Sequence, residues 1–145
     1  MSKVVHPYAP FVFPSSPPLP QGPPTDRPML TVRLESSIGA YYNAFALADS
    51  GADACLFSLR VARSLKLNLA SLPKAMTGGI GNAANVTYYD TITADLGDGM
   101  RFETRAGFTQ GLDQAGIGLL GHLGFFENYN VEFRHRDRIF TIESA

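Results

Sequence analysis

The chain has 145 residues, of which 45% are hydrophobic and 17% charged, a composition typical of one soluble globular domain. Its formal net charge of -1 at pH 7 excludes a global attraction to polyanions, so no nucleic acid and no anionic membrane surface is predicted as a partner. The one cysteine, Cys55, excludes an intrachain disulfide and makes a reducing, cytoplasmic location the expectation. The apolar stretch AGIGLLGHLGFF is too short for a membrane span.

The first 28 residues are rich in proline. All of the 10 prolines except Pro73 lie at or before Pro28. Proline favours polyproline-like extended chain and removes a backbone donor, so regular strand pairing is not expected there. We interpret residues 1–28 as a Pro-rich N-terminal arm or linker, and residues 29–145 as the folded domain. Two forms of the arm remain open: a disordered leader, or an ordered arm docked through apolar residues such as Tyr8.

From Met29 onward the pattern becomes that of β-strands. Residues 29–36 (MLTVRLES) alternate between apolar and polar, residues 40–48 (AYYNAFALA) form a longer strand pattern, and residues 36–39 supply turn chemistry between them. This pattern predicts a hairpin. Ser58 then stands at the N-cap position of an apolar stripe with helical spacing, which predicts one short helix over 59–69.

Three further hairpins follow in the remaining chain. The glycines at 78, 79 and 81 mark one hairpin tip, and Asp98-Gly99 is typical of a two-residue hairpin turn. The C-terminal part predicts a buried apolar strand, a short turn or helix, and a closing hairpin with a basic, solvated tip at 134–138. The predicted fold class is therefore all-β, with short strands, hairpins and one or two short helices.

Several motifs resemble ligand sites but lack the context that such sites require. Gly116–Gly121 matches G-x-G-x-x-G, yet only 24 residues follow Gly121, too few for the crossover helix and second strand of a dinucleotide site. The three scattered histidines and one cysteine have no metal-ligand spacing. No cofactor and no metal is predicted. Cys55 lies in an apolar run and is interpreted as a packed small hydrophobe rather than a nucleophile.

Asp49 is the residue that calls for a chemical explanation, because it ends an apolar strand and precedes Ser50-Gly51. A buried, unpaired carboxylate is costly, so Asp49 must be paired, protonated, or exposed where its charge is used. The segment ALADSGADACLFS resembles the active-site strand and turn of retropepsin-like aspartic proteases, in which apolar residues precede Asp-Thr/Ser-Gly-Ala and another polar or acidic residue follows.

Two other segments resemble the same family and occur in family order. GGIGN lies where these proteins carry a glycine-rich flap hairpin, and IGLLGHLGFF resembles their second apolar strand, which ends in glycine and opens a C-terminal helix. The tail looks like that of prokaryotic members and gag-polyprotein-type relatives. The resemblance implies a small closed acid-protease-like β-barrel over residues 29–145.

The resemblance also implies an aspartic endopeptidase that acts on a peptide or protein substrate. This chemistry needs two carboxylates that share one proton around a water, and the chain carries one D-S-G. Pairing with a second copy on a two-fold axis would supply the other carboxylate, so a homodimer is expected. By resemblance Asp49, Ser50 and Gly51 are catalytic: the acid activates water, the hydroxyl bonds across the dimer, and the glycine permits the tight turn.

The same resemblance assigns substrate-binding roles. Ala52 and Asp53 would face the substrate backbone, while the flap residues Gly79, Ile80 and Gly81 would close over the peptide. His122 departs from the family pattern, because many viral members carry an arginine at this position that pairs with the acid corresponding to Asp53.

Two other functions remain compatible with the sequence. A catalytically silent dimerisation or peptide-binding module would keep the same strands and could keep Asp49. An unrelated small β-barrel could use Asp-Ser-Gly as a plain turn.

Overall fold

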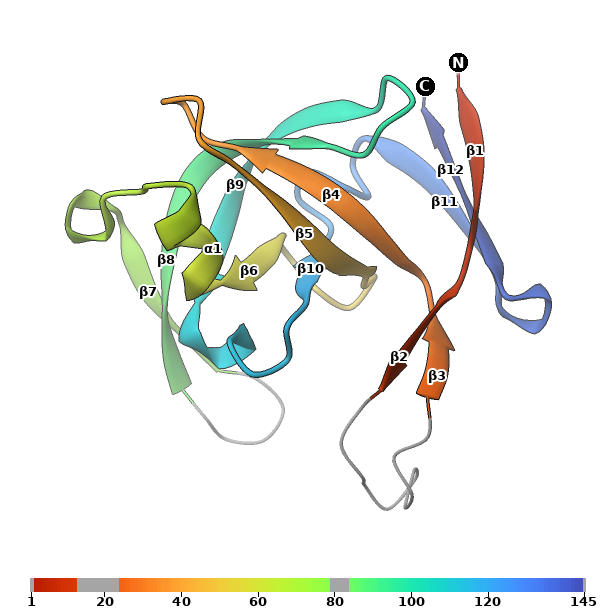
Figure 1. Ribbon diagram of the computed structural model, residues 1–145, viewed down its shortest axis with the longest axis horizontal. Coiled ribbons are helices and arrows are strands. Elements are labelled where there is room, and N and C mark those ends of the chain that lie inside the picture. The colour runs from red at the N-terminus through yellow and green to blue at the C-terminus, as the bar shows by residue number, and fades with distance from the viewer. Residues whose placement is uncertain (1, 13–23, 79–83, 145) are drawn as a thin grey trace.

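The computed structural model describes residues 2–12, 24–78 and 84–144 (Figure 1). Its elements are short and almost entirely strands. The strands are β1 (Lys3–Pro7), β2 (Ala9–Val12), β3 (Pro24–Arg27), β4 (Met29–Glu35), β5 (Tyr41–Ala48), β6 (Leu56–Ser58), β7 (Lys74–Gly78), β8 (Ala84–Asp95), β9 (Arg101–Thr109), β10 (Gly118–Leu120), β11 (Tyr129–Arg134) and β12 (Ile139–Ser144). The helices are α1 (Leu59–Ser64) and the 3-10 turns η1 (Leu69–Ser71), η2 (Gln110–Leu112) and η3 (His135–Asp137).

The strands form a closed barrel with two smaller sheets beside it. Seven strands lie in the order β4-β5-β10-β6-β9-β8-β7, and β4 also pairs with β8, which closes the ring. The smaller sheets have the orders β1-β12-β11 and β2-β3. The all-β class and the closed barrel of short strands are thus confirmed. Within the described ranges, no helix has the length and apolar character needed to traverse a bilayer.

The predicted hairpin of β4 and β5 is confirmed, and it supplies one wall of the barrel. Its register runs from Met29 opposite Leu47 to Glu35 opposite Tyr41. The alternation seen in the sequence places every second side chain of β4 in the core. Gly39 has a φ of 83° in the connecting turn, a conformation that glycine adopts without steric cost.

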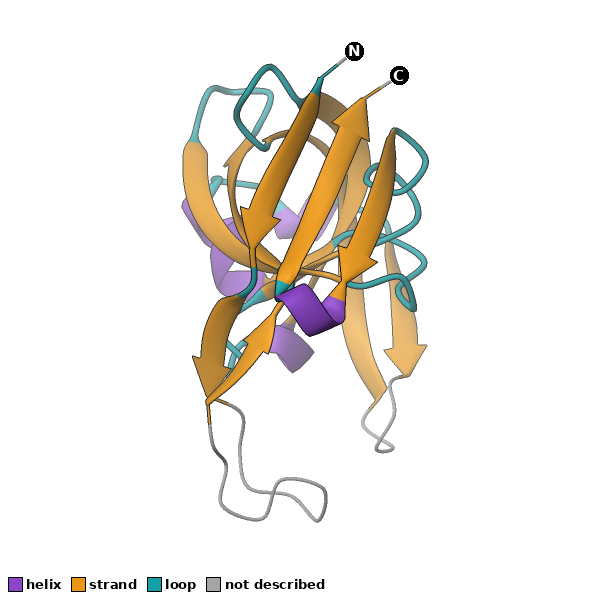
Figure 2. Ribbon diagram, turned by 90° about the vertical axis from the view of Figure 1, so that its right-hand side faces the viewer, coloured by secondary structure: helices purple, strands orange, loops and turns teal. Residues whose placement is uncertain are grey.

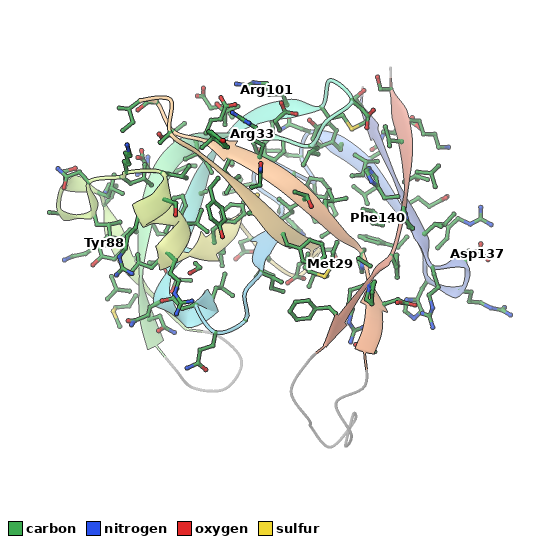
Figure 3. All side chains as sticks on the ribbon, in the orientation of Figure 1. Met29, Arg33, Tyr88, Arg101, Asp137 and Phe140 are labelled. Atoms are coloured by element: carbon green, nitrogen blue, oxygen red, sulfur yellow. The ribbon has the colours of Figure 1, made fainter. Side chains whose placement is uncertain are left out.

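Charged side chains cross the seam where the barrel closes (Figure 3). Glu35 on β4 accepts from Arg33 at 3.0 Å and from Arg101 on β9 at 3.1 Å. Arg101 also lies 3.4 Å from Asp95 on β8. These contacts link β4, β8 and β9 on the outer surface. The Arg33 and Arg101 guanidinium groups lower the pKa of Glu35, through their hydrogen bonds first and their charges second.

The predicted helix forms at the expected start but ends early. Ser58 is its N-cap and accepts a hydrogen bond from the Arg60 N–H at 3.1 Å. Lys66 adopts a left-handed φ of 59° and stops the helix, with Leu67 N–H bonded to the Ala62 carbonyl at 3.1 Å. This is the Schellman arrangement, built here on a lysine instead of a glycine. The helix therefore covers 59–64 and not 59–69.

Two local predictions near the ends of strands are wrong. The turn between β8 and β9 holds three residues, 97–99, all with positive φ, instead of the two-residue Asp98-Gly99 turn. The segment after Gly121 is a series of turns, not the C-terminal helix that the resemblance implied. Gly124 has a φ of 93° there, which interrupts helical geometry.

The expectation that the arm makes no ladder is also wrong. β1 pairs with β12 from Lys3 opposite Glu143 to Pro7 opposite Ile139, and Figure 2 shows β1, β12 and β11 side by side. Pairing is possible because β1 is an edge strand, which needs donors along one side only, and its proline lies at its end. The described part of the arm is thus ordered. A boundary at residue 28 stays a prediction.

The contact of β1 with the C-terminal strand predicts acid-sensitive stability. The His6 ring stacks on Phe140 with centroids 5.3 Å apart. Burial lowers the pKa of His6 below its usual value of 6.5, and the charge of Asp98 opposes this shift. The unfolded chain therefore binds a proton at His6 more readily than the folded protein does, so stability falls as pH decreases below about 6.5.

His6→Phe keeps an aromatic ring on Phe140 and removes this titration. We expect the Tm of the variant minus that of the parent to be a few degrees larger at pH 5 than at pH 8, because only the parent loses stability through His6 at low pH. Thermal unfolding followed by circular dichroism at both pH values measures this difference. A Tm difference that does not change with pH would contradict the prediction.

Candidate active site

The loop that carries Asp49 leaves the barrel at the end of β5. β10 lies between β5 and β6, parallel to the former and antiparallel to the latter. The Asp49 N–H continues the β5–β10 pairing by donating to the Leu120 carbonyl at 3.0 Å. Both ends of the loop are therefore anchored on β10, as can be followed in Figure 1.

The Asp49 carboxylate is held by the turn that follows it. The Gly51 N–H donates to Asp49 Oδ1 at 2.9 Å, and the Ala52 N–H donates to the Asp49 carbonyl at 3.1 Å. Asp49 is half-buried, whereas Ser50 and Gly51 are exposed. The carboxylate is thus partly satisfied by a backbone donor and lies at the surface, where its charge is open to a second molecule.

Gly51 is required by proximity rather than by backbone conformation. Its φ is not in the left-handed region, but a Cβ at this position would lie only 3.3 Å from Asp49 Oδ1. A larger side chain would crowd the carboxylate. Gly51 therefore leaves space beside the Asp49 carboxylate, which is more specific than the expected role of permitting a tight turn.

A second segment, residues 121–123, lies directly against the Asp49 loop. The His122 N–H donates to the Ala52 carbonyl and the Leu123 N–H to the Asp53 carbonyl, each at 2.9 Å. A Cβ on Gly121 would overlap the Ala54 carbonyl oxygen. Glycine at 121 is thus what allows this close approach of two backbones.

The His122 side chain also contacts the loop. Its Nε2 lies 2.5 Å from the Ser50 carbonyl oxygen. It does not take the role of the family's arginine toward Asp53. Sequence reasoning identified His122 as a departure but gave it no role, and its position directly after Gly121 was the one signal that it lies near the loop.

Five of the residues predicted for the site are consecutive and form the loop after β5: Asp49, Ser50, Gly51, Ala52 and Asp53. Ala52 is half-buried and Asp53 is exposed. The other three, Gly79, Ile80 and Gly81, lie outside the described residues. β7 and β8 pair from Lys74 opposite Tyr88 to Gly78 opposite Ala84, so the hairpin predicted to carry them is present.

Cys55 lies next to the site but is not available for chemistry. It is 1% exposed, and its thiol donates to the Leu123 carbonyl at 3.4 Å. Burial raises the pKa of the Cys55 thiol, which disfavours the nucleophilic thiolate. The structure therefore agrees with its interpretation as a packed hydrophobe.

The glycines of the apparent dinucleotide motif have packing roles. Gly116 has a φ of 69°, and a Cβ on Gly118 would overlap the Phe57 ring. Gly118 and Gly121 let β10 and the residues after it pass closely between their neighbours, whereas Gly116 is needed only for its backbone conformation. Among the residues that the structure describes, no group of three or more His, Cys, Asp or Glu side chains is placed to hold a metal ion.

A small cavity of about 110 Å³ lies away from the Asp49 loop. Tyr42, Phe57 and Asp113 are among the residues that line it, and none of residues 49–53 does. Asp113 there accepts hydrogen bonds from the Ser58 hydroxyl and from the Leu59 N–H, so its carboxylate caps the start of α1. This cavity is best explained as part of the packing around that helix.

The comparisons with known proteins agree with this geometry at the level of the fold. No protein-family model matches the chain, and no curated protein matches it in sequence. Among solved structures, a retropepsin-like aspartic protease from Rickettsia conorii is similar, with a TM-score of 0.61 and 15% sequence identity. The similarity covers 97% of this chain and 98% of that one. The chain thus has the fold of a retropepsin-like aspartic protease.

Proposed function

We propose that this chain, with its retropepsin-like fold, is an aspartic endopeptidase that hydrolyses peptide bonds as a homodimer. The observation that carries the proposal is the Asp49 carboxylate at the end of a barrel strand, on an exposed Asp-Ser-Gly turn, with the Gly51 N–H on its Oδ1. A turn without a catalytic role would not require its acid to be fixed to β10 through the β5–β10 pairing.

A second copy of the chain is needed to complete the chemistry. Two carboxylates that share one proton can activate a water, and one chain supplies one Asp-Ser-Gly. In the proposed dimer Asp49 pairs with the partner subunit's Asp49, and one of the two carboxyl groups is ionised. The ionised group takes a proton from the water, while the protonated group donates to the scissile carbonyl. The roles exchange when the amine leaves.

The other predicted residues have supporting roles in this proposal. Ser50 hydrogen-bonds across the dimer and fixes the two loops. Ala52 and Asp53 face the substrate backbone, and residues 79–81 close over the peptide and exclude water. The chemistry requires only carboxylates and water, so no metal or cofactor enters it.

Exposed apolar side chains beside the loop support this dimer. Leu123 is 53% exposed and Phe133 is 39% exposed. Phe126 lies between His122 and Phe133, with ring centroids 5.8 Å and 6.5 Å away. We define the apolar strip as Leu123, Phe126 and Phe133, and we propose that the partner covers it.

Strand exchange through β12 does not fit the structure. β12 is paired with β1 on one edge and with β11 on the other, so its backbone groups are already used. A partner can therefore approach through side chains, or along the outer edges of β1 and β11. This favours side-chain contacts at the apolar strip over insertion of a partner strand beside β12.

Leu123→Glu tests the proposed interface. A charge in the buried strip of a dimer is costly, so the variant should shift from dimer to monomer at micromolar concentration. Ile38→Glu is the matched control, since Ile38 is 68% exposed on the β4–β5 turn, outside the strip. Sedimentation velocity should show a dimer for the parent and for Ile38→Glu. A monomeric parent at these concentrations, with no dimer on addition of a peptide inhibitor, would exclude the proposed dimeric enzyme.

Peptide cleavage itself tests the activity. The protein is incubated with a mixed peptide library between pH 4 and pH 7, with and without a statine-type transition-state mimic, and products are identified by mass spectrometry. We expect cleavage that the mimic blocks. Binding of the mimic without any cleavage would instead support a silent peptide-binding module.

A further inference from the structure

We propose that His122 is a positioning residue for Asp49, which it holds through the peptide group between Ser50 and Gly51. The inference rests on the proposed function, because the acid that His122 positions is the proposed catalytic one. The imidazole Nε2 lies 2.5 Å from the Ser50 carbonyl oxygen. The N–H of the same peptide group, that of Gly51, donates to Asp49 Oδ1 at 2.9 Å.

The planarity of the peptide links these two hydrogen bonds. The C=O and the N–H of one trans peptide point in opposite directions and cannot rotate independently. A donor that fixes the Ser50 carbonyl therefore also fixes the direction of the Gly51 N–H. Because hydrogen bonds in series polarise one another, the bond from His122 also makes the Gly51 N–H a stronger donor to the carboxylate.

The surroundings of His122 fix its backbone and place an aromatic ring beside its imidazole. Its backbone N–H donates to the Ala52 carbonyl at 2.9 Å, and its carbonyl accepts from the Glu127 N–H at 3.1 Å. The ring of Phe126 lies edge-on to the imidazole, at 5.8 Å and an interplanar angle of 68°. The backbone of His122 is thus fixed on both sides, and its exposed imidazole has an aromatic neighbour.

The contact requires a donor at the position of Nε2. A carbonyl oxygen can only accept, so the hydrogen must be on Nε2. The imidazolium form donates from the same atom, so the bond persists whether the ring is neutral or charged. A side chain of similar reach without a donor would leave the peptide free to turn.

Replacing His122 by glutamine or by methionine separates the effect of the hydrogen-bond donor from the effect of side-chain size. The two side chains have the same length, but only His122→Gln keeps an N–H near the Nε2 position. We expect His122→Met to lower kcat about 10- to 100-fold with KM changed less than about twofold, since the acid is misplaced while substrate contacts remain. His122→Gln should recover most of kcat. His135→Met, at the exposed η3 turn, is the control and should match the parent.

A second measurement does not depend on activity. The Gly51 amide is assigned by NMR in the parent and in both variants of position 122, and its hydrogen exchange is followed. Exchange should be faster, and the resonance shifted, in His122→Met but not in His122→Gln. A parent that cleaves nothing but shows this Gly51 pattern would reject the proposed function and keep the positioning contact. An unchanged Gly51 amide in His122→Met, or equal losses of kcat in both variants, would overturn the inference.

Discussion

Replacement of Asp49 by asparagine is expected to lower kcat/KM for peptide cleavage by about 10³- to 10⁴-fold. Asparagine has nearly the same shape, and its Oδ1 can still accept from the Gly51 N–H, so the turn should persist. The amide can neither ionise nor share a proton. In a homodimer the substitution removes both carboxylates at once, so neither the general base nor the general acid remains.

The control for this experiment is Asp137→Asn. Asp137 lies in the exposed η3 turn, 2.9 Å from Arg134, and Figure 3 shows it at the outer end of the β11–β12 hairpin. Its substitution changes the same charge without touching the loop, so activity should equal that of the parent. Sedimentation and circular dichroism should show that both variants are folded dimers. An Asp49→Asn protein that cleaves at the parent rate would place the chemistry elsewhere in the chain.

Structural features that depend on residues close together in the sequence could be predicted from the sequence. The β4–β5 hairpin follows from alternation and turn residues within about 20 positions, and the cap of α1 follows from Ser58 alone. The end of α1 was not readable, because it depends on a left-handed Lys66 where glycine is the usual signal. Local chemistry thus predicts where elements begin better than where they end.

Contacts between segments that are far apart in the sequence were harder to predict. The pairing of β1 with β12 joins the two ends of the described chain, and the proline content of the arm argued against it. The Asp49 loop was found because Asp-Ser-Gly is a compact motif. The His122 contact with Ser50 spans 72 positions and has no pattern of its own, so only the three-dimensional structure reveals it.

Gly121→Ala is expected to be the most destabilising of the small substitutions near the site. The added Cβ would overlap the Ala54 carbonyl oxygen and lie 2.7 Å from the Ala52 carbonyl oxygen. Both obstacles are backbone, which cannot move aside as a flexible side chain can. Relief requires the 121–123 segment to separate from the Asp49 loop, which breaks the bonds from the His122 and Leu123 N–H groups. We expect the free energy of unfolding to fall by about 3 kcal/mol or more.

Gly116→Ala separates this crowding from the ordinary cost of replacing a glycine. Gly116 belongs to the same G-x-G-x-x-G run, but a Cβ there meets no atom within 4 Å, and only its φ of 69° disfavours alanine. Its expected cost is about 1 to 2 kcal/mol. Urea unfolding of both variants measures the difference in their free energies of unfolding, and we expect the m-value to be the same in both. Equal losses in the two variants would show that the close approach of residues 121–123 to the Asp49 loop adds no cost beyond that of replacing an uncrowded glycine, and would contradict the prediction.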